Sequence, residues 1–213
     1  MSESITTLIN SENKGDRITA LNMVREIEPE IAFGYIKQLV TDKNTRVRYA
    51  AVSQLATLGS QDLDQSLTIL RDRLINDSEP DVQAAAADAI GALKLTAAFD
   101  DLQNLYETTP EWLVQFSIIA ALGELGDPRG LTLLQTALTN ETSLVQTAAI
   151  GSIGELGDPS GVESIIPFVI HPDWQIRYQL ARALHNLGGD LATQNLAILA
   201  TDEVEQVAKE ARG

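Results

Sequence analysis

Hydrophobic residues recur along this chain at the spacing of one face of an α-helix, and the whole pattern returns about every 31 residues. Its clearest copies begin at Val47, Val82, Val114, Val145 and Ile176. In each copy further apolar residues follow 4, 5, 8 and 11 positions after the first. At about 100° per residue these positions form one stripe along a helix. A repeat of this length is typical of an array of helix pairs.

A second amphipathic stretch lies before each copy and supplies the other helix of the pair. These stretches are 31–40, 63–75, 98–106, 131–138, 162–170 and, before a weaker last copy at Val207, 191–199. Another weak copy begins at Asp16. The linkers agree with this division, because Gly126-Asp127-Pro128 and Gly157-Asp158-Pro159 each combine a glycine beyond a helix end, an N-capping aspartate and a proline suited to a first turn.

The sequence therefore predicts an all-α fold, a right-handed α-solenoid of about seven helix pairs in one domain, 1–213. The pairs are expected near residues 1–29, 30–60, 61–95, 96–127, 128–158, 159–189 and 190–213. One pair cannot bury its own apolar stripe, so neighbouring pairs share a core and the irregular end copies cap it. The expected core residues include Leu55, Ile90, Leu122, Ile153 and Leu184.

Composition narrows the classes of function. The chain has no cysteine, which excludes disulfides, thiolate metal sites, thiol nucleophiles and thioether attachment of a cofactor. A net charge of −15 argues against a nucleic-acid partner and against anionic membrane surfaces. No apolar run approaches the ~20 residues of a membrane span, and the first residues do not resemble a signal peptide. We expect a cytoplasmic protein with no integral membrane segment.

Motifs for chemistry are missing from the sequence. It contains no Gly-rich phosphate loop, no G-x-S-x-G elbow and no H-E-x-x-H helix. The two histidines, His171 and His185, are 14 residues apart, so no metal site is predicted. Acidic residues such as Asp81, Asp88 and Asp101 are expected on solvated helix faces and at caps. We therefore predict no catalytic residue.

Aromatic residues gather on the second helix of several pairs, which in such solenoids lines the concave face. Tyr49, Phe116 and Tyr178 stand two residues after the start of the pattern, and Trp112 and Trp174 stand two residues before it. Each tryptophan is four residues before an aromatic side chain and so shares a helix face with it.

Glycines and arginines on the same helices complete a candidate groove. Glycine in a helix interior costs ~1 kcal/mol against alanine, so Gly123, Gly151 and Gly154 need a reason. They either permit close approach of neighbouring helices or form the smooth floor of a groove that binds a flat ligand or a partner helix. Arg177 and Arg182 would then border that groove, although Arg177 could equally be a buried residue paired with an aspartate.

Several strings resemble a known family. The segments V-R-Y-A-A-V, V-Q-A-A-A-A-D-A-I-G-A-L and A-L-G-E-L-G-D-P resemble the phycobilisome-lyase type of HEAT-like repeat over essentially the whole chain. The strings at 70–74, 81–86 and 111–116 are most similar to the degradation type of this family from cyanobacteria. A HEAT-like, armadillo-type superhelix is the fold that this resemblance implies.

The resemblance also implies a function. It implies partners among the phycobiliprotein subunits, phycocyanin and allophycocyanin, and a place near the thylakoid through the phycobilisome. It implies a free bilin such as phycocyanobilin as a transient ligand, with no tightly bound cofactor, and a role in detaching the chromophore during phycobilisome degradation. Two alternatives stay open: a bilin lyase subunit that attaches the chromophore, and an adaptor that binds proteins without a chromophore.

Overall fold

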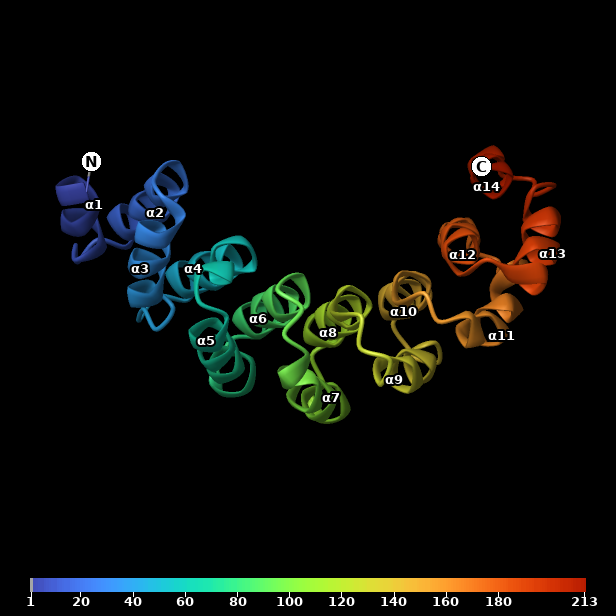
Figure 1. The fold of residues 1–213 in the computed structure, drawn as a ribbon, viewed down its shortest axis with the longest axis horizontal. Helices are drawn as coiled ribbons and strands as arrows, with labels where there is room; N and C mark the ends of the chain where they lie inside the picture. The colour runs from blue at the N-terminus through green and yellow to red at the C-terminus, as the bar shows by residue number, and fades with distance from the viewer. Residues whose placement is uncertain (1) are drawn as a thin grey trace. The chain divides into compact units, whose positions relative to one another are not determined.

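The computed structural model describes residues 2–213, with side chains from residue 4 onward. Over this range the chain forms fourteen α-helices and five short 3-10 helices, and it contains no strand. By their internal contacts the residues form two compact units, 1–118 and 119–213, and each is described by itself. Both are stacks of helix pairs (Figure 1), as the α-solenoid prediction requires.

The first unit stacks its second helices directly on one another. Its helices are α1 (Ser2–Ile9), α2 (Lys14–Met23), α3 (Pro29–Leu39), α4 (Thr45–Leu58), α5 (Leu63–Asn76), α6 (Pro80–Ala92), α7 (Phe99–Thr108) and the start of α8 (Trp112–Leu125). The second helices α2, α4 and α6 pack in sequence, and α3 and α5 each pack against the second helix of their own pair.

The second unit repeats this arrangement. It contains the end of α8, then α9 (Gly130–Ala137), α10 (Ser143–Leu156), α11 (Val162–Ile165), α12 (Trp174–Leu187), α13 (Gly189–Leu199) and α14 (Glu205–Arg212). Here α10, α12 and α14 form the row of second helices, with α9 packed on α10 and α13 packed on both α12 and α14. The predicted core residues Leu55, Ile90, Leu122, Ile153 and Leu184 are all fully buried, which confirms the register of the apolar stripe.

One predicted first helix is shorter than the pattern suggests. The amphipathic stretch 162–170 forms α11 only as far as Ile165, and residues Ile166–Ile170 continue as a 3-10 helix. Pro167 stands at the start of the 3-10 segment. Proline lacks the amide hydrogen that an α-helix needs and clashes with the preceding turn, so the helix changes type there.

The predicted helix ends are confirmed at both Gly-Asp-Pro linkers. Gly126 and Gly157 follow α8 and α10 with φ of 68° and 71°, the left-handed conformation that favours glycine. The carboxylates of Asp127 and Asp158 then accept hydrogen bonds from backbone N–H groups two residues later. These bonds give acceptors to backbone N–H groups at the start of the next helical turn, which have no hydrogen-bond partner within the helix.

Three arginines at equivalent places link consecutive loops. Each stands one residue after the start of its repeat and pairs with an aspartate in the loop before the next second helix: Arg17 with Asp42, Arg48 with Asp77 and Arg177 with Asp202, at Nε–Oδ2 distances of 2.6, 2.8 and 2.6 Å. Each also donates from Nη1 to a backbone carbonyl of the loop before its own helix. These ion pairs are largely buried. They therefore stabilise the fold only if further hydrogen bonds satisfy the remaining polar atoms of both side chains.

Among the residues described, no helix combines the length and apolar character that crossing a membrane requires.

Candidate functional site

The structure places aromatic side chains on the surface of the second helices. Tyr49 on α4 is 47% exposed, Trp112 on α8 is 47% exposed and Trp174 on α12 is 40% exposed. Phe116 and Tyr178, one turn after the two tryptophans, are half-buried. Aromatic rings that are partly exposed can bind an apolar or flat partner. The pair Trp112–Phe116 belongs to the first unit and the pair Trp174–Tyr178 to the second.

The glycines of the expected groove lie in helix contacts instead. A Cβ atom on Gly123 would stand 2.8 Å from the Cα atom of Ser152, and one on Gly154 would stand 2.6 Å from the Cα atom of Ala183. Both distances are too short for real atoms, and backbone cannot move aside cheaply. Gly151 is also buried, against the side chain of Gln179. Gly123 and Gly154 therefore let neighbouring helices approach closely, and the interpretation of these two glycines as a groove floor is wrong; Gly151 packs against the Gln179 side chain.

Replacing Gly154 by alanine tests this packing. The substitution should gain up to ~1 kcal/mol of helix propensity but lose more through overpacking, which costs about 1–3 kcal/mol. We expect a net loss in the free energy of unfolding, measured by chemical denaturation. Gly34, inside α3, is the matched control because nothing lies within 4 Å of a Cβ atom there. Gly34→Ala should stabilise the protein, and equal effects at both sites would contradict the contact.

Arg177 also lies outside any groove. Its side chain is 9% exposed and pairs with Asp202 through Nε at 2.6 Å and Nη2 at 2.9 Å. A third bond runs from Nη1 to the carbonyl oxygen of His171 at 2.7 Å. The expectation that Arg177 borders a binding surface is corrected by this geometry, because its hydrogen-bonding groups are used inside the fold.

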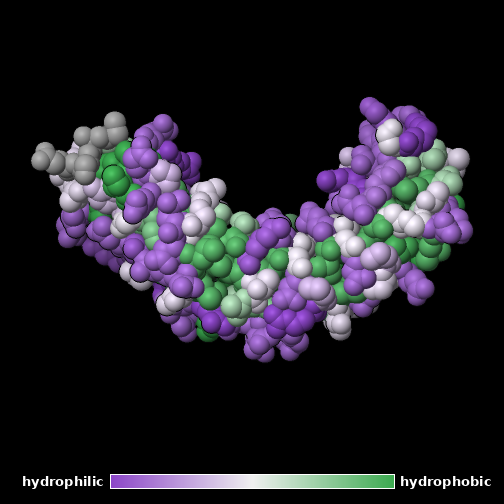
Figure 2. All heavy atoms as spheres, viewed as in Figure 1, coloured by the Kyte–Doolittle hydropathy of each residue, from purple (hydrophilic) through white to green (hydrophobic). Residues whose placement is uncertain are grey.

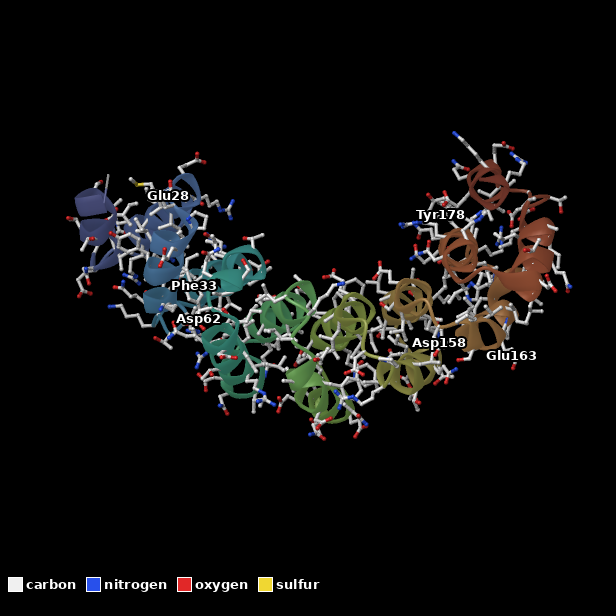
Figure 3. All side chains as sticks on the ribbon, viewed as in Figure 1. Glu28, Phe33, Asp62, Asp158, Glu163 and Tyr178 are labelled. Atoms are coloured by element: carbon white, nitrogen blue, oxygen red, sulfur yellow. The ribbon has the colours of Figure 1, made fainter. Side chains whose placement is uncertain are left out.

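A surface hollow of about 560 Å³ lies between α12 and α14 in the second unit. We call it the α12–α14 hollow; it is lined by Tyr178, Arg182, His185, Asn186, Gln206, Lys209, Glu210 and Gly213. Figure 3 shows Tyr178 on the side of α12 that faces away from α13. Of the predicted site residues, this hollow brings together Tyr178 and Arg182, and Trp174 lies one turn before Tyr178.

Charged groups meet in the α12–α14 hollow. The Tyr178 hydroxyl hydrogen-bonds the Glu210 carboxylate, which raises the pKa of Tyr178. The Nε2 atom of His185 lies 2.9 Å from the backbone oxygen of Glu210. Burial raises the pKa of Glu155 on α10, and Arg182 opposes that rise. Arg182 and Lys209 are two exposed cations in a chain that is otherwise strongly acidic.

A second hollow, of about 410 Å³, lies in the first unit. We call it the α4–α6–α8 hollow; it is lined by Thr45, Arg46, Tyr49, Asp81, Ala84, Ala85, Asp88, Leu113 and Ser117. Tyr49 is the predicted site residue found here. In the view of Figure 2, hydrophobic residues are visible around α6, whereas hydrophilic residues cover most of α14. The linings of the two hollows also differ: Arg182 and Lys209 line the α12–α14 hollow, whereas Asp81 and Asp88 line the α4–α6–α8 hollow.

Several lining residues were not among the predicted ones. In the α4–α6–α8 hollow these are Asp81 and Asp88 on α6 and Leu113 on α8. In the α12–α14 hollow they are His185, on the same helix as Tyr178, and Lys209 on α14. The sequence repeat could have indicated some of these residues. Each hollow is lined by residues that stand one position before, and two to six positions after, the start of the next copy of the pattern. In the part of the chain that the structure describes, no three or more His, Cys, Asp or Glu residues lie together where they could hold a metal ion.

The repeats match a known family model. The model for HEAT repeats matches residues 67–152 and again residues 137–212, which together span more than half of the chain. A comparison with curated proteins gives no significant match.

Solved structures share the fold. The complex of CpcE and CpcF of phycocyanin lyase from Nostoc sp. PCC7120 matches with a TM-score of 0.63 at 20% identity, over 88% of this chain and 75% of that one. The YibA protein of Escherichia coli matches with a TM-score of 0.64 at 17% identity, over 94% and 73%. An engineered protein matches with a TM-score of 0.65 at 20% identity, over 98% of this chain and 66% of that one. At these identities the similarity concerns the fold alone.

Proposed function

The chain belongs to the HEAT-repeat family, and from this premise we propose that it binds phycobiliprotein subunits and takes up their bilin chromophore transiently. The proposal places it with proteins such as NblB, which assist phycobilisome degradation, and near the thylakoid through the phycobilisome. Two observations support it. The repeat strings resemble that family over the whole chain, and a phycocyanin lyase is among the solved structures with the same fold.

The observation that carries the proposal is the chemistry of the α12–α14 hollow. A bilin is a flat chain of apolar rings that carries two propionates. The guanidinium group of Arg182 and the ammonium group of Lys209 suit the propionates, since charge-assisted bonds to carboxylates are among the strongest hydrogen bonds. The rings of Tyr178 and the neighbouring Trp174 suit the pyrrole rings by stacking. A volume of about 560 Å³ falls in the usual range for sites that bind small molecules.

The absence of cysteine agrees with a transient ligand. Bilins are held covalently in antenna proteins through thioether bonds to cysteine, and this chain has none. A bilin received from an antenna subunit would therefore be bound here by contacts and charge alone, and it could be released again.

The test is a titration of free phycocyanobilin into the protein, followed by its visible absorption spectrum. We expect Arg182→Glu to weaken binding by roughly 10-fold or more, because it replaces a charge-assisted bond by repulsion. Lys14→Glu reverses another exposed charge, on α2, and should leave binding unchanged. Trp174→Ala should also weaken binding, whereas Ile198→Ala, which truncates a side chain that is 54% exposed on α13, should not. If Arg182→Glu and Trp174→Ala both fold normally and bind like the parent protein, the site is elsewhere.

A lyase subunit that attaches the bilin is the second candidate, favoured by the fold shared with CpcE and CpcF. Incubation of the protein with intact phycocyanin and, separately, with bilin and the bilin-free apoprotein distinguishes the two. Loss of bound chromophore from the intact protein supports detachment, and gain of covalent chromophore by the apoprotein supports a lyase. Binding of phycocyanin with no spectral change in either mixture would support an adaptor.

A further inference from the structure

The α4–α6–α8 hollow offers a second surface, in residues 1–118, whose chemistry is opposite to that of the α12–α14 hollow. Its floor includes the methyl groups of Ala84 and Ala85, which are both buried on α6. Tyr49 on α4 and Leu113 on α8 line it as well, and the Tyr49 side chain is 47% exposed. A floor of small side chains between larger ones admits the side chains, and the backbone, of another molecule.

Carboxylates mark this hollow along α6. Asp81 and Asp88 are seven residues apart, which places them on one face of the helix about 10 Å apart along its axis. Both are exposed. Arg46 is the single cationic residue among those that line the hollow. With two carboxylates against one guanidinium, and a chain charge of −15, the potential at this surface favours a cation.

The exposed ring of Tyr49 gives the hollow a preference for the side chains of arginine and lysine. A guanidinium or ammonium group over an aromatic face is attracted by the ring's electrons, and arginine does this more often than lysine. The exposed ring of Tyr49 lines the hollow together with Ala84 and Ala85. Acidic side chains, an aromatic ring and an apolar floor in one hollow complement a side chain that is cationic at its end and apolar along its stem, as arginine and lysine are.

We propose that the α4–α6–α8 hollow docks a partner protein through a segment that carries an arginine or lysine next to an apolar residue. The cationic group binds between Asp81 and Asp88 and lies over the Tyr49 ring, and the apolar residue packs on Ala84 and Leu113. Nucleic acid does not fit this surface because its phosphates would meet the carboxylates. The inference is independent of the bilin site, because the two hollows share no residue.

The experiment is a selection of short peptides from a random display library on the intact protein at about 0.15 M salt, where distant charges are screened. Enriched peptides are then synthesised and their affinities measured by fluorescence anisotropy. We expect a basic residue beside an apolar one in the enriched set. We also expect binding to weaken by roughly 10-fold or more in the double variant Asp81→Asn, Asp88→Asn.

The matched control removes the same charge from the other row of helices in this unit. The control is the double variant Asp64→Asn on α5, Glu107→Gln on α7. It should leave the peptide affinities unchanged, because both residues are exposed and neither lines the hollow. Tyr49→Ala should weaken binding, and Tyr49→Phe should restore it because the aromatic face is kept. Thermal melting of every variant checks that the fold is retained.

Other outcomes overturn the proposal. These are the absence of any enriched peptide, an enriched set without basic residues, and equal binding by the parent and the Asp81, Asp88 double variant. Two further results assign the hollow to another occupant. Spermine that binds as tightly as the peptides indicates a site for small cations, and self-association that the double variant abolishes indicates a second copy of this chain.

Discussion

Replacing Arg177 by methionine is expected to lower the free energy of unfolding by about 3–5 kcal/mol, because it breaks a buried ion pair and strands the partner charge. The Asp202 side chain is 7% exposed and receives two hydrogen bonds from this guanidinium. The carbonyl oxygen of His171 loses its bond as well. Methionine preserves most of the side-chain volume, so packing changes little and the effect reports the lost hydrogen bonds.

The effect of Arg177→Met should depend on pH. The Arg177 guanidinium holds the pKa of Asp202 below its ordinary value of 3.8. A carboxyl whose pKa is lowered in the folded state stabilises the fold above its ordinary pKa, and this stability is lost as the pH falls through the folded-state value. The difference between parent and variant should therefore be full at neutral pH and should shrink below about pH 4. Urea denaturation curves across this range measure it.

Two further variants decide whether the buried pair is the cause. Arg182→Met changes an exposed arginine on the same helix and should alter the free energy of unfolding by less than about 0.5 kcal/mol. Adding Asp202→Asn to Arg177→Met removes the stranded charge and should recover part of the loss. A loss below about 1 kcal/mol for Arg177→Met alone would mean that solvent reaches Asp202 and hydrates it.

The helix pairs could be predicted because their signal is local and repeated. Each apolar stripe lies within one copy of the pattern, and Leu55, Ile90 and Ile153 are buried as the register requires. The glycine after a helix end and the aspartate that caps the next helix also act within a few residues. Pro167 was visible in the sequence, but the stretch around it is amphipathic enough to suggest one continuous helix. The local effect of proline outweighed the pattern.

The surfaces of the second helices were harder to predict, because such a helix packs on both sides as well as inward. Gly123 and Gly154 occupy positions opposite the apolar stripe, yet these positions face the next second helix rather than solvent. From the sequence, Arg177 could likewise face either a neighbouring repeat or a surface groove. A sequence signal did exist for it: Arg17 precedes Asp42 by 25 residues and Arg177 precedes Asp202 by 25 residues, so the pairing recurs with the repeat.

Truncating Leu122 to alanine is expected to cost about 2–5 kcal/mol in the free energy of unfolding, because the cavity left in a packed core adds to the lost burial of the side chain. Leu122 is fully buried on α8 and stands next to Gly130, at the start of α9. Leu144→Ala on α10 is the control, because that leucine is 51% exposed and its truncation leaves no cavity. We expect the control to change stability by less than about 1 kcal/mol in the same denaturant titration. A comparably small loss for Leu122→Ala would place this residue outside the core and shift the register of the central repeat.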